Sequence, residues 1–81
     1  GMHEVDPVEL LALAARRFER AHPGRVLEPA WPGELPRIHA NFDGLARALD
    51  NVLDNAAKYS APERPIRLTA TVTADALELA V

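Results

Sequence analysis

Residues 45–60 read LARALDNVLDNAAKYS, and this stretch says more about the fold than any other part of the chain. Its apolar residues recur at three- and four-residue spacing, which predicts an amphipathic helix over about residues 42–59. The expected apolar stripe consists of Leu45, Leu49, Val52, Leu53 and Ala56. The expected solvent-facing side carries Arg47, Asp50, Asp54 and Lys58. Asn51, Asn55 and Tyr59 fall on one flank, between the stripe and the solvent-facing side.

The two asparagines are the unusual residues of this helix. Asparagine inside a helix costs about 0.5 kcal/mol relative to alanine, because its side chain competes for backbone hydrogen bonds. Asn51 and Asn55 stand four residues apart, so they project from the same flank, close to Lys58 and Tyr59. Amide oxygens are suitable ligands for Mg²⁺, an ammonium group suits phosphate, and a tyrosine ring offers a face to a nucleobase. The pattern therefore predicts a nucleotide-binding surface on this flank of the helix.

A plainer interpretation stays open at this point. The asparagines can instead cap or bridge neighbouring loops, with Lys58 and Tyr59 as ordinary surface residues. By residue type alone, this second interpretation is the commoner one.

A second helix is expected near the start of the chain, over about residues 7–22. Asp6 stands at the N-cap position and Pro7 at the first helical position, while His22-Pro23-Gly24 ends the pattern. The expected apolar face consists of Val8, Leu11, Ala15 and Phe18. His22 and His39 have no spacing typical of metal ligands and are expected at the surface.

The remaining segments predict strands. Residues 25–31 contain Pro29, which confines such a strand to a sheet edge, and residues 37–40 form a short extended stub. Residues 66–73 alternate apolar and polar side chains, and a turn at Ala74-Asp75 leads into a further strand, which gives a hairpin over about residues 65–81. Leu77, Leu79 and Val81 are expected on one face of that last strand. The order helix-strand-strand-helix-strand-strand predicts an α/β (α+β) two-layer sandwich, with one sheet covered on one face by two helices.

Composition excludes several classes of protein. The 81 residues allow one domain at most, and twelve acids against nine bases give a net charge of −3, which does not favour nucleic acid as a partner. The absence of cysteine excludes disulfides and thiolate metal sites. No apolar run is long enough to span a membrane and no signal peptide is evident, so a cytoplasmic location is expected. Gly1-Met2 looks like the scar of a cleaved tag, and residues 1–5 are expected to be a tail.

The amino-acid sequence of residues 45–60 resembles the N-box motif of the ATP-binding domain of sensor histidine kinases. That domain has the Bergerat fold shared with gyrase. The family pattern L-x-x-[VA]-L-x-N-L-L-x-N-A-x-K-[YF]-[ST] is matched except for Val52, where leucine is usual. The order of elements agrees as well, so the resemblance covers residues 6–81 as a partial ATP-binding domain.

The resemblance implies a role for each matching position. Asn55 is implied to be the Mg²⁺ ligand next to the ATP phosphates, and Lys58 to contact a phosphate. Tyr59 is implied to lie against the adenine or ribose, and Asn51 to support the site. The family's D-x-G-x-G motif, whose aspartate binds the adenine amino group, is expected where this sequence ends at Val81, and the later lid is missing too.

We therefore expect a fragment of a bacterial two-component sensor kinase. The parent protein would bind Mg-ATP and phosphorylate a histidine for transfer to a response regulator, with any membrane anchor outside this chain. The fragment itself is expected to bind ATP weakly or not at all and to be inactive. The alternative is a non-catalytic interaction module that keeps only the first half of the fold. Under either hypothesis an unpaired strand edge predicts self-association, as a homodimer or by exchange of elements.

Overall fold

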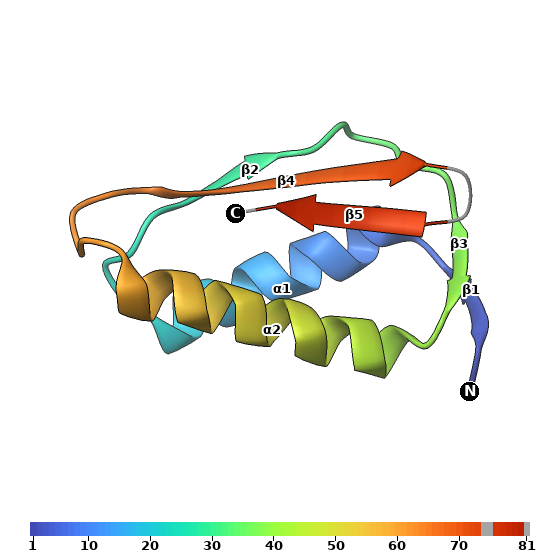
Figure 1. The fold of residues 1–81 in the computed structure, drawn as a ribbon, viewed down its shortest axis with the longest axis horizontal. Helices are drawn as coiled ribbons and strands as arrows, with labels where there is room; N and C mark the ends of the chain where they lie inside the picture. The colour runs from blue at the N-terminus through green and yellow to red at the C-terminus, as the bar shows by residue number, and fades with distance from the viewer. Residues whose placement is uncertain (74–75, 81) are drawn as a thin grey trace.

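A computed structural model describes residues 1–73 and 76–80 of the chain. These residues form two long helices and five strands (Figure 1). The elements are β1 (His3–Val5), α1 (Pro7–Ala21), β2 (Leu27–Ala30), β3 (Ile38–Ala40), α2 (Phe42–Tyr59), β4 (Ile66–Thr73) and β5 (Ala76–Ala80). The predicted α/β class is confirmed, and both helices have nearly the predicted bounds.

The strands form two small sheets, whereas one sheet was predicted. In the larger sheet, of order β2-β4-β5, β2 runs parallel to β4 and β5 runs antiparallel to it. β2 lies at an edge, as Pro29 required. The antiparallel hairpin is confirmed, while the predicted turn at Ala74 and Asp75 and the last residue, Val81, lie outside the described residues. The side chains of β5 are also outside the description, so the face assigned to Leu77 and Leu79 stays a prediction.

The second sheet joins β1 to β3, and the sequence pattern did not predict it. Residues 1–5 were predicted to be a tail, but His3–Val5 pairs antiparallel with Ile38–Ala40. Val5 is buried at 2% exposure and Ile38 at 6%. The stub was therefore correctly placed, but its partner was not, because three residues are too few for a strand pattern to stand out.

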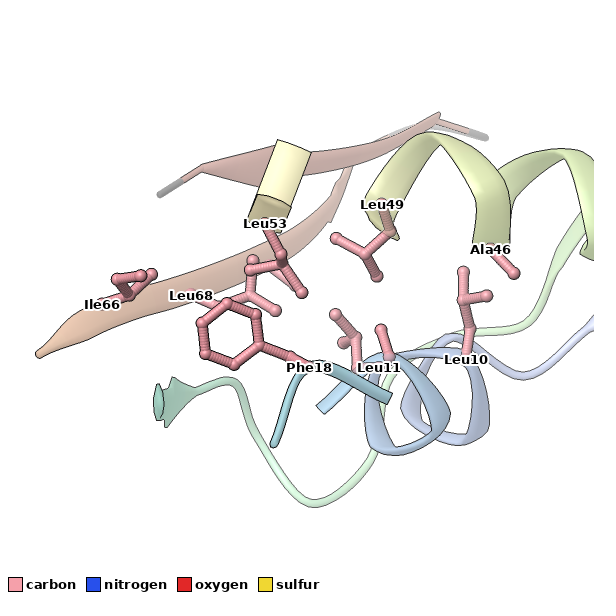
Figure 2. Close-up of a cluster of buried hydrophobic side chains, with 10 residues drawn as sticks. Leu10, Leu11, Phe18, Ala46, Leu49, Leu53, Ile66 and Leu68 are labelled. Atoms are coloured by element: carbon pink, nitrogen blue, oxygen red, sulfur yellow. The ribbon is translucent and has the colours of Figure 1, made fainter. Parts of the chain in front are cut away.

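Both helices pack on one face of the β2-β4-β5 sheet and bury a single apolar core (Figure 2). β4 contributes Ile66, Leu68 and Ala70, which are buried, while Arg67 and Thr71 on the alternate positions are exposed. The alternation predicted for this strand is confirmed for these residues. The helices contribute Leu10, Leu11, Ala14, Phe18, Ala46, Leu49 and Leu53. No helix within residues 1–73 is long and apolar enough to cross a bilayer.

The buried face of α1 differs from the predicted one. Leu11 and Phe18 are buried as expected, but Leu10 and Ala14 fill the places predicted for Val8 and Ala15, which are only partly buried. α1 is rich in leucine and alanine on several sides, so helical spacing alone allows more than one apolar face. Contact with β4 and α2 decides among these faces, and that information is not in the local pattern.

Candidate functional site

Capping fixes the start of α2. The Asn41 side chain accepts a hydrogen bond from the Gly44 backbone N–H at 2.8 Å, and Leu45 N–H donates to the Asn41 carbonyl at 3.0 Å. Asn41 thus caps the helix, as an asparagine at this position commonly does. Asp43 lies in the first turn and Lys58 in the last, each at the end of the helix dipole that favours its charge.

One side of α2 lies against α1 and is held there by polar contacts. Arg17 donates to Asp50 at 3.0 Å, and the His22 ring nitrogen Nε2 lies 2.8 Å from Asp54. His22 also stacks on Phe18, with ring centroids 4.7 Å apart. Asp50 and Asp54 were predicted on the solvent-facing side, and Asp54 is exposed as predicted. Both nevertheless lie at the border of the helix interface, where Asp50 binds Arg17 and Asp54 binds His22 at the end of α1. His22 was predicted to be a plain surface residue and instead joins the two helices.

α2 also presents a side that α1 does not cover, and the candidate site residues lie there. Asn51, Asn55, Lys58 and Tyr59 are all exposed, with Tyr59 at 78%. We call this set the asparagine flank. Neither asparagine side chain has a hydrogen-bond partner among the described residues, so neither caps nor bridges a described loop. The plainer interpretation of the asparagines, as structural bridges, is thus not supported for residues 1–73.

Val52 lies beside this flank and was predicted to be buried in the apolar stripe. It is 42% exposed, whereas its neighbour Leu53 is 1% exposed. The stripe that is buried runs through Ala46, Leu49 and Leu53, so it is turned toward α1 relative to the predicted one. An apolar side chain is therefore partly exposed next to Asn51 and Asn55.

The C-terminal end of the asparagine flank combines a cation with an aromatic ring. Lys58 Nζ lies 5.4 Å from the centroid of the Tyr59 ring, which is within the range of a cation–π contact. Beside Tyr59 is a surface hollow of about 320 Å³, whose lining includes Ser60, Arg64 and Arg67. Ammonium, guanidinium and aromatic groups in one region suit a ligand that has both negative charge and a flat ring.

The arginines of this region were not among the predicted site residues. Arg64 and Arg67 line the hollow. Arg25, which lies just before β2, reaches the end of α2. Arg67 was placed on the outward face of β4 by alternation, and that position was the one available signal. Nothing in the local sequence pointed to Arg25, because its partners lie 32 to 39 residues away.

Another hollow, of about 140 Å³, lies in the groove between the helices. Arg17, Phe18, Asp50 and Asp54 are among the residues that line it. The Arg17–Asp50 ion pair spans its rim, and the groove is on the side of α2 away from Asn51 and Asn55. Among the side chains of residues 1–72, no group of three histidine, aspartate or glutamate residues is arranged to hold a metal ion. The groove is thus accounted for by helix packing.

Comparison with known proteins gives no matching protein-family profile but does give similar individual proteins. The adaptive-response sensory kinase SasA of Synechococcus elongatus is 46% identical over 39 residues. That match covers 48% of this chain and 10% of SasA.

Two solved structures match over most of the chain. The ATP-binding domain of PrrB from Mycobacterium tuberculosis has a TM-score of 0.76 at 28% identity, over 96% of this chain and 56% of that one. The mycobacterial sensor histidine kinase MprB has a TM-score of 0.68 at 30% identity, over 88% of this chain and 44% of that one. The chain thus spans about half the length of these structures. Its predicted resemblance to the ATP-binding domains of sensor histidine kinases is confirmed.

Proposed function

From this resemblance, we propose that the chain is part of the ATP-binding domain of a bacterial sensor histidine kinase and that the asparagine flank of α2 binds Mg-ATP. The observation that carries the proposal is the state of Asn51 and Asn55. Both are exposed inside a helix, with no hydrogen-bond partner among the described residues. Each costs the helix about 0.5 kcal/mol relative to alanine, and no described contact offsets that cost. A ligand for the amide oxygens accounts for both residues.

Each residue of the flank has a role that suits its chemistry and place. The Asn55 amide oxygen faces the metal and phosphates, and Asn51, one turn earlier, supports it from the same side. Lys58 contacts a phosphate as a flexible point charge. Tyr59 lies against the adenine or ribose, next to the hollow lined by Arg64 and Arg67.

The residues present fit magnesium held chiefly by the nucleotide. Mg²⁺ prefers oxygen ligands in octahedral geometry and commonly keeps several waters while binding one or two protein groups and substrate phosphates. The flank offers amide oxygens and no carboxylate cluster among the described residues. Bound there, the metal would neutralise phosphate charge, and Asn55 would hold it.

The parent protein in this proposal transfers phosphate from ATP to a histidine and then to a response regulator, in the cytoplasm, where ATP is available. The chain alone supplies the proposed contacts to metal and phosphate but not the aspartate expected to bind the adenine amino group. We therefore propose that it binds Mg-ATP no tighter than the millimolar range and has no kinase activity. Calorimetry that gave a low-micromolar dissociation constant for this chain would contradict that part of the proposal.

The proposed binding role of the asparagine flank is tested by replacing Lys58. We expect Lys58→Ala to weaken Mg-ATP binding about fivefold, because a partly exposed charge-assisted hydrogen bond contributes about 1 kcal/mol. Arg16→Ala is the matched control, since it removes one exposed positive charge from α1 and not from the helix that carries the flank. Binding is followed by nuclear magnetic resonance titration at millimolar ATP.

Equal weakening by both variants would show that net charge alone attracts the nucleotide, and the proposed site would be wrong. Asn55→Ala distinguishes binding through the metal from binding through the phosphates. The loss of affinity should be large for Mg-ATP and small for ATP measured with a chelator present.

A second candidate is a non-catalytic module that associates with its own copies. The order β2-β4-β5 leaves the outer edge of β5 without a strand partner among the described residues, and such edges are templates for pairing. Under this hypothesis two copies pair along β5. Light scattering at tens of micromolar should then report a dimer, and a monomer mass would count against it.

A further inference from the structure

Arg25 joins two parts of the chain that are far apart in sequence. It precedes β2, and its guanidinium group reaches the C-terminal end of α2. Nη1 donates to the Ala57 carbonyl at 2.8 Å, and Nη2 donates to Ser60 Oγ at 2.8 Å. Nη2 also approaches the Arg64 carbonyl at 3.4 Å, in the loop between α2 and β4. One side chain thus binds the last turn of α2, its cap and the loop that follows.

The backbone around Arg25 explains why the side chain is aimed at α2. Gly24 has φ of +87°, which turns the chain sharply after α1, and Arg25 N–H closes the turn on the His22 carbonyl at 3.1 Å. One residue later, the Val26 carbonyl accepts from Ile66 N–H at 2.9 Å. The starts of β2 and β4 are therefore held side by side, so the position of Arg25 relative to the end of α2 is fixed by the sheet.

One of the groups that Arg25 binds, the Ala57 carbonyl, is among those that a helix end leaves unsatisfied. The last four carbonyls of a helix have no partner within it, and a cation is favoured at that end by the dipole. Ser60 Oγ donates to the Ala56 carbonyl at 2.6 Å while it accepts from Arg25. The two neighbouring carbonyls, of Ala56 and Ala57, are thus satisfied by Ser60 and Arg25. The last turn of α2 is tied to the start of β2 by these bonds.

Lys58 and Tyr59 lie between the residues that Arg25 binds. Their side chains are exposed and form no hydrogen bond or ion pair with the described residues, so local polar contacts do little to hold this part of the flank. Their backbone lies between Ala57 and Ser60, both bound by the same guanidinium group. The direction in which Lys58 and Tyr59 project therefore depends on Arg25.

We propose that Arg25 is a positioning residue for the nucleotide-binding flank: it touches no ligand, but its bonds to Ala57 and Ser60 hold Lys58 and Tyr59 in their binding directions. This inference rests on the function proposed above. Arginine suits the task better than lysine, because its planar group presents several donors at fixed spacing. Its Nε is buried with no acceptor among the described residues, which shows that the group has given up water in order to reach α2.

The test compares Arg25→Ala, Arg25→Lys and Ser60→Ala with the control Arg16→Ala, an exposed arginine of α1 for which no contact with α2 is found. In the first readout, amide hydrogen exchange, Arg25→Ala should lower protection of the Ser60 amide about tenfold and leave that of Leu53 unchanged. Ser60→Ala removes one acceptor and is the milder variant if Arg25→Ala does not fold. Unchanged exchange at the end of α2 in both variants would overturn the proposal.

The second readout is the Mg-ATP titration of the same variants. We expect Arg25→Ala to weaken binding about fivefold, Arg25→Lys to recover part of the loss through its one charged nitrogen, and Arg16→Ala to have no effect. Looser exchange at the end of α2 with unchanged ATP binding would show a purely structural role and overturn the positioning claim, while the proposed function would stand. No response to Mg-ATP in the unsubstituted chain would overturn the proposed function, and the positioning role with it.

Discussion

The most direct test of the core compares two adjacent residues of α2, Leu53 and Val52. The sequence pattern placed both in one buried stripe, but Leu53 is 1% exposed and Val52 is 42% exposed. Leu53→Ala removes three carbons from the cluster around Phe18 and Leu68. At about 0.8 kcal/mol per buried carbon, with a further cost for the cavity, we expect a loss of about 3 kcal/mol.

Val52→Ala should behave differently. It removes two carbons that are already partly in water, which costs about 1 kcal/mol, and alanine regains about 0.5 kcal/mol of helix propensity. The net change should lie within about 0.5 kcal/mol of zero. This residue is thus the control for Leu53, at the next position of the same helix.

Urea unfolding measures both variants, followed by helical circular dichroism and by the fluorescence of Trp31, which packs against the core. Agreement of the two probes checks that unfolding is two-state. A chain of this length is expected to have about 4–12 kcal/mol of stability, so Leu53→Ala should lower the urea midpoint substantially or unfold the chain outright. If the two variants differed by less than about 1 kcal/mol, α2 could not be oriented with Leu53 inward and Val52 outward.

Three further changes follow from local geometry. Asp6→Ala removes the acceptor for the Val8 N–H at 3.0 Å and should cost about 1 kcal/mol in urea unfolding, and no change would mean that the cap is not formed. Gly24→Ala should lower the free energy of unfolding by about 1 kcal/mol, because the backbone φ of Gly24 is +87° and side chains disfavour that conformation. The added carbon itself would meet no atom within 4 Å, so an unchanged stability would show that the turn relaxes. The Arg17–Asp50 pair, with side chains 50% and 33% exposed, should give a coupling below about 1 kcal/mol in a double-mutant cycle that shrinks in high salt, and a larger, salt-independent coupling would contradict the exposure.

The parts of the fold that sequence could predict are those with strong local signals. Both helices begin at polar caps, Asp6 and Asn41, and the bounds predicted for the helices are close to those of the structure. β4 alternates cleanly, so its buried face was predicted. In each case the information lies within a few neighbouring residues.

The parts that it could not predict depend on contacts between distant segments. β1 is three residues long and is stabilised by pairing with β3, which lies more than thirty residues later. The exposure of Val52 beside the buried Leu53 is set by the position of α1, and Arg25 finds its partners 32 to 39 residues away. The candidate site shows the same division: the asparagine flank follows from helical spacing, whereas the arginine that ties its end to the sheet does not.

Binding of Mg-ATP to the asparagine flank is tested most directly by a nuclear magnetic resonance titration of this chain with assigned resonances. At about 10 mM nucleotide, a site with a dissociation constant near 1 mM is mostly occupied. We expect shifts centred on the side-chain amides of Asn51 and Asn55 and on the backbone of Lys58 and Tyr59, absent when Asn55 and Lys58 are replaced by alanine. Shifts centred on α1, or none at the asparagine flank, would contradict the proposed site.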